Sequence, residues 1–385
     1  MKILILGGDG YLGWPTAMHF SNRGDEVAVL DNFAKRGWEL ENGIKPLINV
    51  PTLHSRIKRW HEVTGKDIEL FVGDLCNHRY IYNVLKKFTP DAIIHYGEQP
   101  SAPYSMQSRE KAVYTQENNV IGNLNLMFAM ERYCPNAHLI KLGTMGEYGT
   151  PNIDIEEGWL DVYHNGRTEK MLYPKKPHSF YHLSKVHDSH NIEFACRVWG
   201  LRATDLNQGC VYGLQTNETE MDPMFLTSFH YDDIFGTVLN RFLVQASVGS
   251  ALTVYGSGKQ TRGFLNIRDT IRCVELSVEN PADPGDLRIF NQFTEQFSVM
   301  QLAEKVIAVG QKLGLNTELS HLENPRVEQE DHYYNAKHSK LVDLGLDPYL
   351  LTDDLLKKML LIIKENSYLV DKDFFKPRVK WHKSI

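Results

Sequence analysis

Six short apolar runs are spaced along the first half of the chain, and amphipathic or polar stretches separate them. The runs lie at residues 2–6, 26–30, 68–72, 92–96, 138–142 and 202–206. Continuous apolar runs of this length are typical of strands that are buried on both faces, and helices connect such strands when they run parallel. The pattern therefore predicts an α/β fold with a Rossmann-type doubly wound parallel sheet.

The pattern changes after residue 206, where loops lengthen and glycine, arginine and aromatic residues cluster. We predict a Rossmann domain at residues 1–206, with 236–280 partly returning to it. A smaller C-terminal substrate-binding domain is expected at 207–235 and 281–385.

Two segments receive no role in this scheme. Residues 32–66 form a long connection, which we predict to be a helical insertion that decorates the surface. The basic tail, Lys372 to Ile385, is predicted to be peripheral.

The loop after the first apolar run carries Gly7, Gly10 and Gly13, a G-x-x-G-x-x-G spacing. Glycine permits a tight turn there, a close approach of the backbone to a pyrophosphate, and close packing of the next helix. The free N–H groups and the dipole at that helix start favour phosphate. A plain turn is the alternative, but the strand, the loop and the following acid favour dinucleotide binding.

That acid is Asp31, at the end of the second apolar run, where a carboxylate accepts hydrogen bonds from an adenosine ribose and repels a 2′-phosphate. Arg36 keeps NADP open as an alternative, and Asp31 makes NAD the better prediction. Gly73–Leu75 end the third predicted strand at a place suited to the adenine ring. The predicted NAD-binding residues are Gly7, Gly8, Asp9, Gly10, Tyr11, Gly13, Asp31, Asn32, Arg36, Asp74, Leu75, Asn119, Tyr181 and Lys185.

Tyr181 and Lys185 stand four residues apart in a predicted helix, and therefore share one face. A neighbouring ammonium favours the tyrosine phenolate, which can take a proton from a sugar hydroxyl. Thr144, at the end of the fifth predicted strand, can bond the same hydroxyl. A base, an ammonium and a hydroxyl are what hydride transfer from a carbinol carbon requires. A surface Tyr/Lys pair is the alternative, and the glycine loop upstream favours catalysis.

Composition narrows the function class. The formal charge of −6 argues against a broad nucleic-acid surface, and no apolar run reaches membrane-span length. The five cysteines show no C-x-x-C pair, which suggests reduced thiols in a cytoplasmic protein without a zinc site. His187 and His190 lack a third ligand at a convincing spacing, so no metal is expected. The first strand begins at once, so no signal or transit peptide is expected.

The glycine loop and the Thr/Tyr/Lys set resemble those of the extended short-chain dehydrogenase/reductases, which act on nucleotide sugars. Longer strings are more specific, and they closely resemble the UDP-sulfoquinovose synthases over about residues 1–350. These strings are 8–11, 101–106, 143–158, 180–191, 203–209, 252–256, 260–263, 290–299, 324–328 and 332–338.

The resemblance implies a reaction of UDP-glucose with sulfite that gives UDP-sulfoquinovose and water. Its expected course is oxidation at C4 by bound NAD, loss of water across C5–C6, sulfite addition at C6 and reduction at C4. It also implies a homodimer formed through helices near 115–133 and 181–199. The expected substrate-binding residues, with the two arginines on the pyrophosphate, are Thr144, Met145, Asn207, Gln208, Tyr255, Gln260, Arg262 and Arg326. A plain surface position is the alternative for Arg262.

Two departures from related enzymes matter. Sugar-nucleotide dehydratases carry Asp-Glu directly after the threonine, whereas this chain has Met145 and Gly146, with its acid displaced to Glu147. His182 is therefore our hypothesis for the C5 base or the C6 acid, helped by Glu147 or water, with simple packing as the alternative. Pro100 stands where plant-type relatives have an arginine, which puts a local anion contact in doubt.

Two other functions fit parts of the pattern. A UDP-hexose 4-epimerase would use the same glycine loop and the same Tyr181, Lys185 and Thr144. A non-enzymatic NAD-sensing or RNA-binding protein of this fold would tolerate loss of the tyrosine or lysine, and both are present here.

Overall fold

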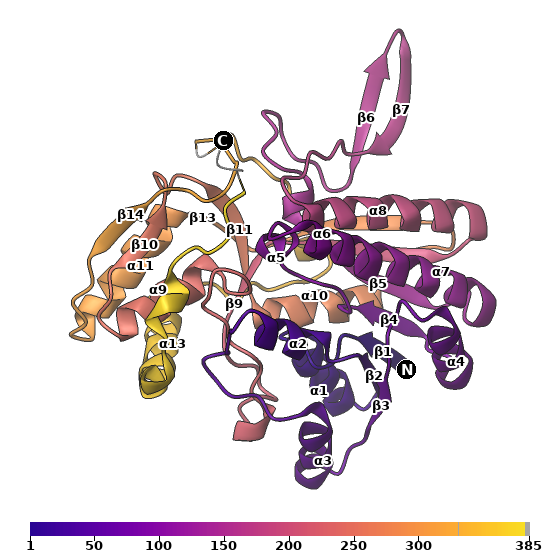
Figure 1. Ribbon diagram of the computed structural model, residues 1–385. Coiled ribbons are helices and arrows are strands. Elements are labelled where there is room, and N and C mark those ends of the chain that lie inside the picture. Colours follow the sequence, from indigo (N-terminus) through magenta and orange to yellow (C-terminus); the bar gives the residue numbers. More distant parts are fainter. Residues whose placement is uncertain (330, 382–385) are drawn as a thin grey trace.

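A seven-stranded parallel sheet forms the centre of the larger part of the molecule (Figure 1). The computed structural model describes residues 1–329 and 331–381. Within them the strand order is β12-β8-β5-β4-β1-β2-β3, which confirms the predicted doubly wound sheet. The strands are β1 (Lys2–Leu6), β2 (Glu26–Asp31), β3 (Ile68–Val72), β4 (Ala92–His95), β5 (His138–Thr144), β8 (Arg202–Gln208) and β12 (Leu287–Gln292).

Helices cover both faces of this sheet. Leu4 and Leu6 of β1 face one layer of helices, and Ile3 and Ile5 face the other, so alternate residues build two cores. The first layer holds α4 (His78–Phe88), α7 (Gly122–Tyr133) and α8 (Phe180–Trp199). The second holds α1 (Gly13–Arg23), α3 (Leu53–Thr64) and α10 (Ile267–Glu279). In the described part of the chain, no helix is long and apolar enough to cross a membrane.

The strand order reverses between β1 and β4, which pair in parallel with Leu6 opposite His95. Chain segments leave the two strands toward opposite faces, so a crevice opens outside their carboxyl ends. Open α/β sheets bind ligands at such a switch point. The glycine loop after β1 and the loop after β4, which leads to α5 (Ala102–Ser105), both lie there.

A second, smaller part has its own core, built on α9 (Val238–Ser247), α11 (Val299–Lys312) and α13 (Asp353–Glu365). Two small sheets pack with these helices, in the orders β10-β14 and β13-β11-β9. Their strands are β9 (Cys210–Tyr212), β10 (Leu252–Tyr255), β11 (Thr261–Asn266), β13 (Glu295–Ser298) and β14 (Leu319–Leu322).

The chain passes between the two parts several times. β12 adds the edge strand to the large sheet beside β8, although it falls in the segment 281–385 that we expected in the substrate domain. α10, from the segment 236–280, packs against the same sheet, while α9 packs in the smaller core. The exact domain boundaries therefore stay a prediction.

The insertion at 32–66 is not surface decoration. It forms α2 (Ala34–Glu41) and α3, and between them Leu47 and Ile48 are buried in the core of the smaller part. Trp60 of α3 is fully buried against the large sheet. The insertion thus ties the two parts together, because its apolar residues divide between the two cores.

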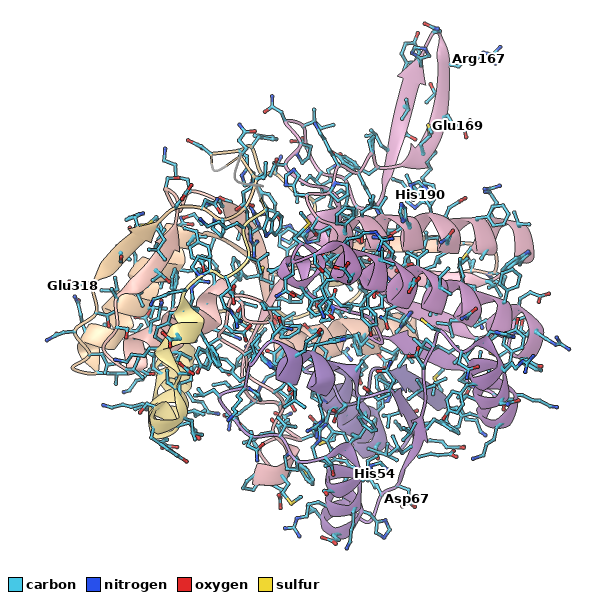
Figure 2. All side chains as sticks on the ribbon, viewed as in Figure 1. His54, Asp67, Arg167, Glu169, His190 and Glu318 are labelled. Atoms are coloured by element: carbon cyan, nitrogen blue, oxygen red, sulfur yellow. The ribbon has the colours of Figure 1, made fainter. Side chains whose placement is uncertain are left out.

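Further helical segments and a hairpin complete the larger part of the molecule. Residues 109–133 form α6 (Arg109–Gln116), a π-helical turn at Glu117–Ile121 and then α7. The hairpin of β6 (Trp159–His164) and β7 (Arg167–Leu172) stands away from the body, with Arg167 and Glu169 on it (Figure 2). α12 (Lys340–Asp343) packs near β12.

Candidate active site

A cavity of about 600 Å³ opens at the carboxyl ends of β1, β4, β5 and β8 and reaches β10 and β11 of the smaller part. A volume of this size suits a cofactor or substrate site. Most of the predicted site residues line it, namely Gly7, Asp9, Gly10, Tyr11, Gly13, Asp31, Asn32, Arg36, Asp74, Leu75, Thr144, Tyr181, His182, Gln208, Tyr255, Gln260, Arg262 and Arg326.

The glycine loop is packed too closely for side chains. Gly7 has a φ of +85°, and a Cβ on Gly13 would lie 2.0 Å from the carbonyl oxygen of Gly7. No side chain caps the start of α1, so no capping residue uses its first N–H groups. This start of the helix lines the cavity. This backbone cradle fits a pyrophosphate, because helix N–H groups and the helix dipole favour negative charge. The Tyr11 hydroxyl donates to the carbonyl of Gly213 at 2.7 Å, which anchors the loop.

The Asp31 carboxylate lies beside this loop. It accepts hydrogen bonds from the backbone N–H groups of Asp9, at 2.8 Å, and Phe33, at 2.7 Å. Burial raises the pKa of Asp31, and these two N–H groups oppose the rise. Asn32 donates to Asp74 at 3.0 Å across the adjoining wall. The arrangement holds an acceptor where an adenosine ribose would lie.

Arg36 does not offer a free guanidinium to this region. It forms an ion pair with Asp9, with Nε at 2.6 Å, and donates to the carbonyls of Val50 and Pro51. Arg56, which we missed, is fully buried, contacts Asp9 at 2.5 Å and lies over the Trp14 ring at 4.8 Å. Burial lowers the pKa of Arg56 to about 10. Asp9 and two backbone carbonyls thus engage Arg36, and Arg56 is buried, which favours NAD over a 2′-phosphorylated cofactor.

Tyr181 and Lys185 lie on one face of α8, with the Lys185 ammonium 5.7 Å from the centre of the Tyr181 ring. Ser179 caps this helix by accepting from the His182 N–H at 3.1 Å. Lys185 donates to the Leu142 carbonyl at 2.7 Å and forms a short ion pair with Glu98. Burial raises the pKa of Tyr181, and the Glu98 charge adds to the rise, so these surroundings favour the protonated phenol.

Glu98 is the residue that sequence analysis missed at the centre of the site. Its other carboxylate oxygen contacts Lys141 of β5 at 3.0 Å and His95 at 3.5 Å. Burial acts to raise its pKa, but Lys141 and Lys185 together lower the pKa of Glu98 to about 2. Burial lowers the pKa of Lys185, and the Glu98 charge opposes that fall. Glu98 therefore favours the charged form of the ammonium beside Tyr181.

Lys141 links Glu98 to a second buried acidic residue. Its ammonium also contacts Asp188 of α8 at 3.1 Å, and Asp188 accepts from Asn123 of α7 at 3.2 Å. Burial raises the pKa of Asp188 to about 8, although Lys141 opposes the rise. Two lysines and two carboxylates thus share a buried site that no single motif in the sequence marks.

His182 lies against the turn that follows β5. Its Nδ1 is 3.0 Å from the Ser179 hydroxyl, and a Cβ on Gly146 would fall 2.3 Å from its Nε2. Burial, with Arg326 and Arg262 nearby, lowers the pKa of His182 to about 3. The imidazole is therefore neutral at ordinary pH and can accept a proton. It occupies the space that a side chain at position 146 would need.

Several predicted residues lie outside the cavity wall. Glu147 is buried, accepts from the Thr144 N–H at 3.1 Å and pairs with Lys175, so its carboxylate caps the turn Met145–Glu147. Met145 packs in a small apolar cluster with Tyr148. Asn207 donates to the Tyr148 hydroxyl at 2.8 Å. The structure does not bring these three side chains to the cavity.

Three further predicted residues act from behind the wall. Asn119 donates to Gln99 and Ser184 and accepts from the Gln99 N–H at 2.8 Å, so it supports the loop after β4. Gly8 packs against Val29, where a Cβ would lie 2.5 Å from the valine Cβ. Lys185 reaches the cavity through its contact with Glu98.

The far end of the cavity carries positive charge. Arg262 of β11 donates to the Thr261 carbonyl at 2.8 Å and pairs with Glu328, and Arg326 lies beside it on the cavity wall. Arg241 of α9, which we missed, is buried with its guanidinium 4.3 Å from the centre of the Tyr255 ring. No sequence motif marks Arg241, because it stands within an ordinary amphipathic helix.

Two segments that we expected at the surface also form the wall. Lys35, Trp38 and Val50 of the insertion line the cavity, as do Pro377, Val379 and Trp381 of the tail. The prediction of a peripheral tail is therefore wrong for these positions. Residues 382–385 lie outside the described residues.

Comparison with known proteins agrees with this geometry. Residues 3–291 match the NAD dependent epimerase/dehydratase family. The chain is 54% identical over 382 residues to the chloroplastic UDP-sulfoquinovose synthase of Spinacia oleracea, covering 99% of this chain and 79% of that protein. It is 40% identical over 386 residues to the UDP-sulfoquinovose synthase of Sulfolobus acidocaldarius, covering 100% of this chain and 98% of the relative.

The chain belongs to the UDP-sulfoquinovose synthase family. The same fold is seen in the UDP-glucose 4-epimerase of Thermus thermophilus in complex with NAD, with a TM-score of 0.67, 23% identity and coverage of 94% and 99% of the two chains. As a UDP-sulfoquinovose synthase family member it is an NAD-dependent enzyme, and the glycine cradle and Asp31 fit that cofactor.

We expect Glu98→Gln to impair catalysis by Tyr181, because Glu98 favours the charged form of the neighbouring Lys185. The amide leaves two buried ammonium groups with one fewer counter-charge, which should lower the free energy of unfolding by about 3–5 kcal/mol. Without Glu98 the pKa of Lys185 falls further, so activity should be lost at lower pH than in the wild type as the pH rises. Urea unfolding and the pH profile of NAD reduction by UDP-glucose measure both effects.

Glu157→Gln is the matched control. Glu157 is a buried carboxylate that accepts from the backbone N–H groups of Asn291 and Lys340, away from Lys185. It should lose some stability and keep the wild-type pH profile. An unshifted alkaline limb in Glu98→Gln would refute the assigned role of Glu98.

Proposed function

We propose that this enzyme converts UDP-glucose and sulfite into UDP-sulfoquinovose and water. Membership of the family supports this reaction, and one structural observation supports it most directly. His182 fills the space above Gly146, next to Tyr181 and Thr144. A neutral base thus lies beside the residues that oxidise a sugar hydroxyl, where dehydratases carry an acid pair.

NAD would be held by the glycine loop on its pyrophosphate and by Asp31 on its adenosine ribose. When bound, NAD takes a hydride from C4 of the sugar and later returns it. Lys185 would hold the second ribose and stabilise the Tyr181 phenolate, since a nearby positive charge favours the ionised form. With NAD bound, Tyr181 would also face a positively charged nicotinamide ring, which would counter the rise in the pKa of Tyr181 that burial causes.

Tyr181 takes the proton of the C4 hydroxyl as general base. Thr144 hydrogen-bonds the same hydroxyl, and its side-chain oxygen already accepts from the Gly146 N–H at 3.2 Å, which fixes its rotamer. The C4 carbon becomes a carbonyl, and that carbonyl makes the neighbouring C5–H acidic.

His182 accepts the C5 proton and passes it to the C6 hydroxyl, which leaves as water. The resulting C5–C6 double bond is conjugated with the C4 carbonyl, so C6 accepts the lone pair of sulfite sulfur. As its sulfur adds to C6, hydrogen sulfite gives its proton to His182, and the imidazolium passes this proton to C5. Tyr181 then returns its proton to the C4 oxygen as C4 is reduced. Protons and electrons balance, because UDP-glucose and hydrogen sulfite give the sulfonated sugar and water.

The nucleotide end of the substrate would lie toward Arg262 and Arg326. A guanidinium group can bind diphosphate oxygens through two parallel hydrogen bonds, and both arginines line the cavity. Tyr255 and Gln260 lie on the same wall and suit the uridine.

We also propose a homodimer formed through α7 and α8. Phe128 of α7 and Phe194 and Val198 of α8 are about half exposed, and Phe128 and Phe194 both pack on Trp199. Exposed apolar side chains on adjacent helices mark an interaction surface. We propose a cytoplasmic location, which the free state of the five cysteines supports.

Purified NAD-loaded enzyme given UDP-glucose and sulfite should form a sulfonated UDP-sugar, detected by mass spectrometry. No such product should form without sulfite. Tyr181→Phe should lower the rate by about 10²–10⁴-fold, because the general base is lost. UDP-galactose as sole product would show a 4-epimerase instead and overturn the proposal.

His182→Ala should reduce exchange of the C5 hydrogen with deuterated water by at least about 100-fold, since the base is removed. NAD reduction by UDP-glucose should continue, because Tyr181 and Thr144 remain. Gly146→Ala should act in the same direction by displacing the ring. The exposed His190 on the same helix (Figure 2) offers a control, and His190→Ala should exchange C5 at the wild-type rate. An unchanged rate of C5 hydrogen exchange in His182→Ala would show that His182 is not the C5 base.

A further inference from the structure

The two arginines at the nucleotide end of the cavity are held differently. Arg262 is already engaged, by Glu328 and by the Thr261 carbonyl. The Arg326 guanidinium makes no hydrogen bond or ion pair with any residue that the structure describes, although the backbone N–H of Arg326 donates to the side-chain oxygen of Asn324 at 3.1 Å. Arg326 is thus the cation with donors to spare for an anionic ligand.

A ring from the far end of the chain holds that guanidinium in place. The Arg326 guanidinium lies 5.4 Å from the centre of the Trp381 ring, a cation–π contact. The backbone N–H of Trp381 donates to the carbonyl of Pro325 at 3.0 Å, so a backbone hydrogen bond also joins the two loops. Arg326 and Trp381 both line the cavity. The ring fixes the direction of the arginine and leaves the guanidinium N–H groups without a hydrogen-bond partner among the described residues.

The segment that carries Trp381 is fastened across the cavity wall. Residues 371–381, here called the C-terminal strap, leave α13 and run toward β11 and α5 (Figure 1). Arg378 pairs with Asp233 at 2.8 Å and donates to the Asn42 carbonyl at 2.9 Å. Val379 is 7% exposed and packs with Ile44 of the insertion. The strap is therefore tied to three segments that surround the cavity.

We propose that the C-terminal strap completes the diphosphate site, with Trp381 as the positioning residue that holds Arg326 for the nucleotide sugar. Arg378 fastens the strap to Asp233 and Asn42, and Trp381, its last described residue, packs on Arg326. These contacts place the strap over the nucleotide end of the cavity. A diphosphate that binds Arg326 therefore stabilises the seated strap, and the seated strap strengthens diphosphate binding. The inference rests on the nucleotide-sugar substrate of the proposed function, and it does not depend on sulfite.

Calorimetric titration of NAD-loaded enzyme with UDP tests the proposal. Trp381→Ala should raise the Kd for UDP about tenfold, which corresponds to ~1.4 kcal/mol. The KM for UDP-glucose should rise by about the same factor and kcat should change less, because Trp381 acts through Arg326, which we assign to binding of the diphosphate. Trp381→Phe should restore most of the affinity, since a ring over Arg326 suffices.

Tyr368→Ala is the matched control, because Tyr368 is an aromatic residue in the same terminal region that is 80% exposed. It should bind UDP as the wild type does. Equal affinity in Trp381→Ala and the wild type would overturn the proposal. The bound NAD content of each variant reports whether the sheet is intact, and it should not change.

Limited trypsin digestion tests strap closure in the unmodified enzyme. Arg378 and Lys380 offer cleavage sites within the strap, and UDP should slow cleavage there several-fold while NAD alone should not. Asp233→Asn, which weakens the Arg378 anchor, should speed cleavage in the absence of UDP. Cleavage that UDP does not slow would contradict the proposal. Both experiments remain decisive even if no sulfite is incorporated, because neither measures the sulfonated product.

Discussion

One buried carboxylate, Glu98, is shared by two lysines that come from different elements, and the site depends on this arrangement. It joins the end of β4 to Lys141 of β5 and Lys185 of α8, within hydrogen-bonding distance of each. Burying three charges is costly, and only their mutual contacts offset the loss of hydration. The helix that carries Tyr181 can therefore settle in one position against the sheet. Asp188, one turn farther along α8, binds the same Lys141 and gives that position a second attachment.

The second constraint is steric. His182 and Gly146 fit together because glycine leaves room for the imidazole, and the displaced acid, Glu147, turns inward to cap its own turn and pair with Lys175. Dehydratases carry an acid pair where this chain has Met145 and Gly146. The absence of a side chain at Gly146 leaves the room that His182 occupies. A neutral imidazole in that place supplies a base without adding a negative charge close to an incoming sulfite anion.

The strand pattern, the glycine loop, Asp31 and the Tyr181–Lys185 pair were predictable, since each depends on local periodicity or on a spacing within one element. The placements of Glu98 and Arg241 were not, because each becomes part of the site only through contacts distant in sequence. The insertion at 32–66 and the tail were misjudged for the same reason. Leu47 and Trp381 look like ordinary loop residues until the second part of the molecule is placed beside them. Asn207 and Met145 stand beside site residues in their motifs, yet Asn207 donates to Tyr148 and Met145 packs in an apolar cluster, because a neighbour in sequence can face the core.

The central claim is that one sugar carbon is oxidised and then reduced on the same enzyme while its neighbours exchange hydroxyl for sulfonate. UDP-glucose that carries deuterium at C4 tests this directly, with sulfite and NAD-loaded enzyme in ordinary water. The account predicts a sulfonated UDP-sugar that retains deuterium at C4 in the gluco configuration. A sulfonated product that has lost this deuterium, or deuterated UDP-galactose without sulfur, would contradict it.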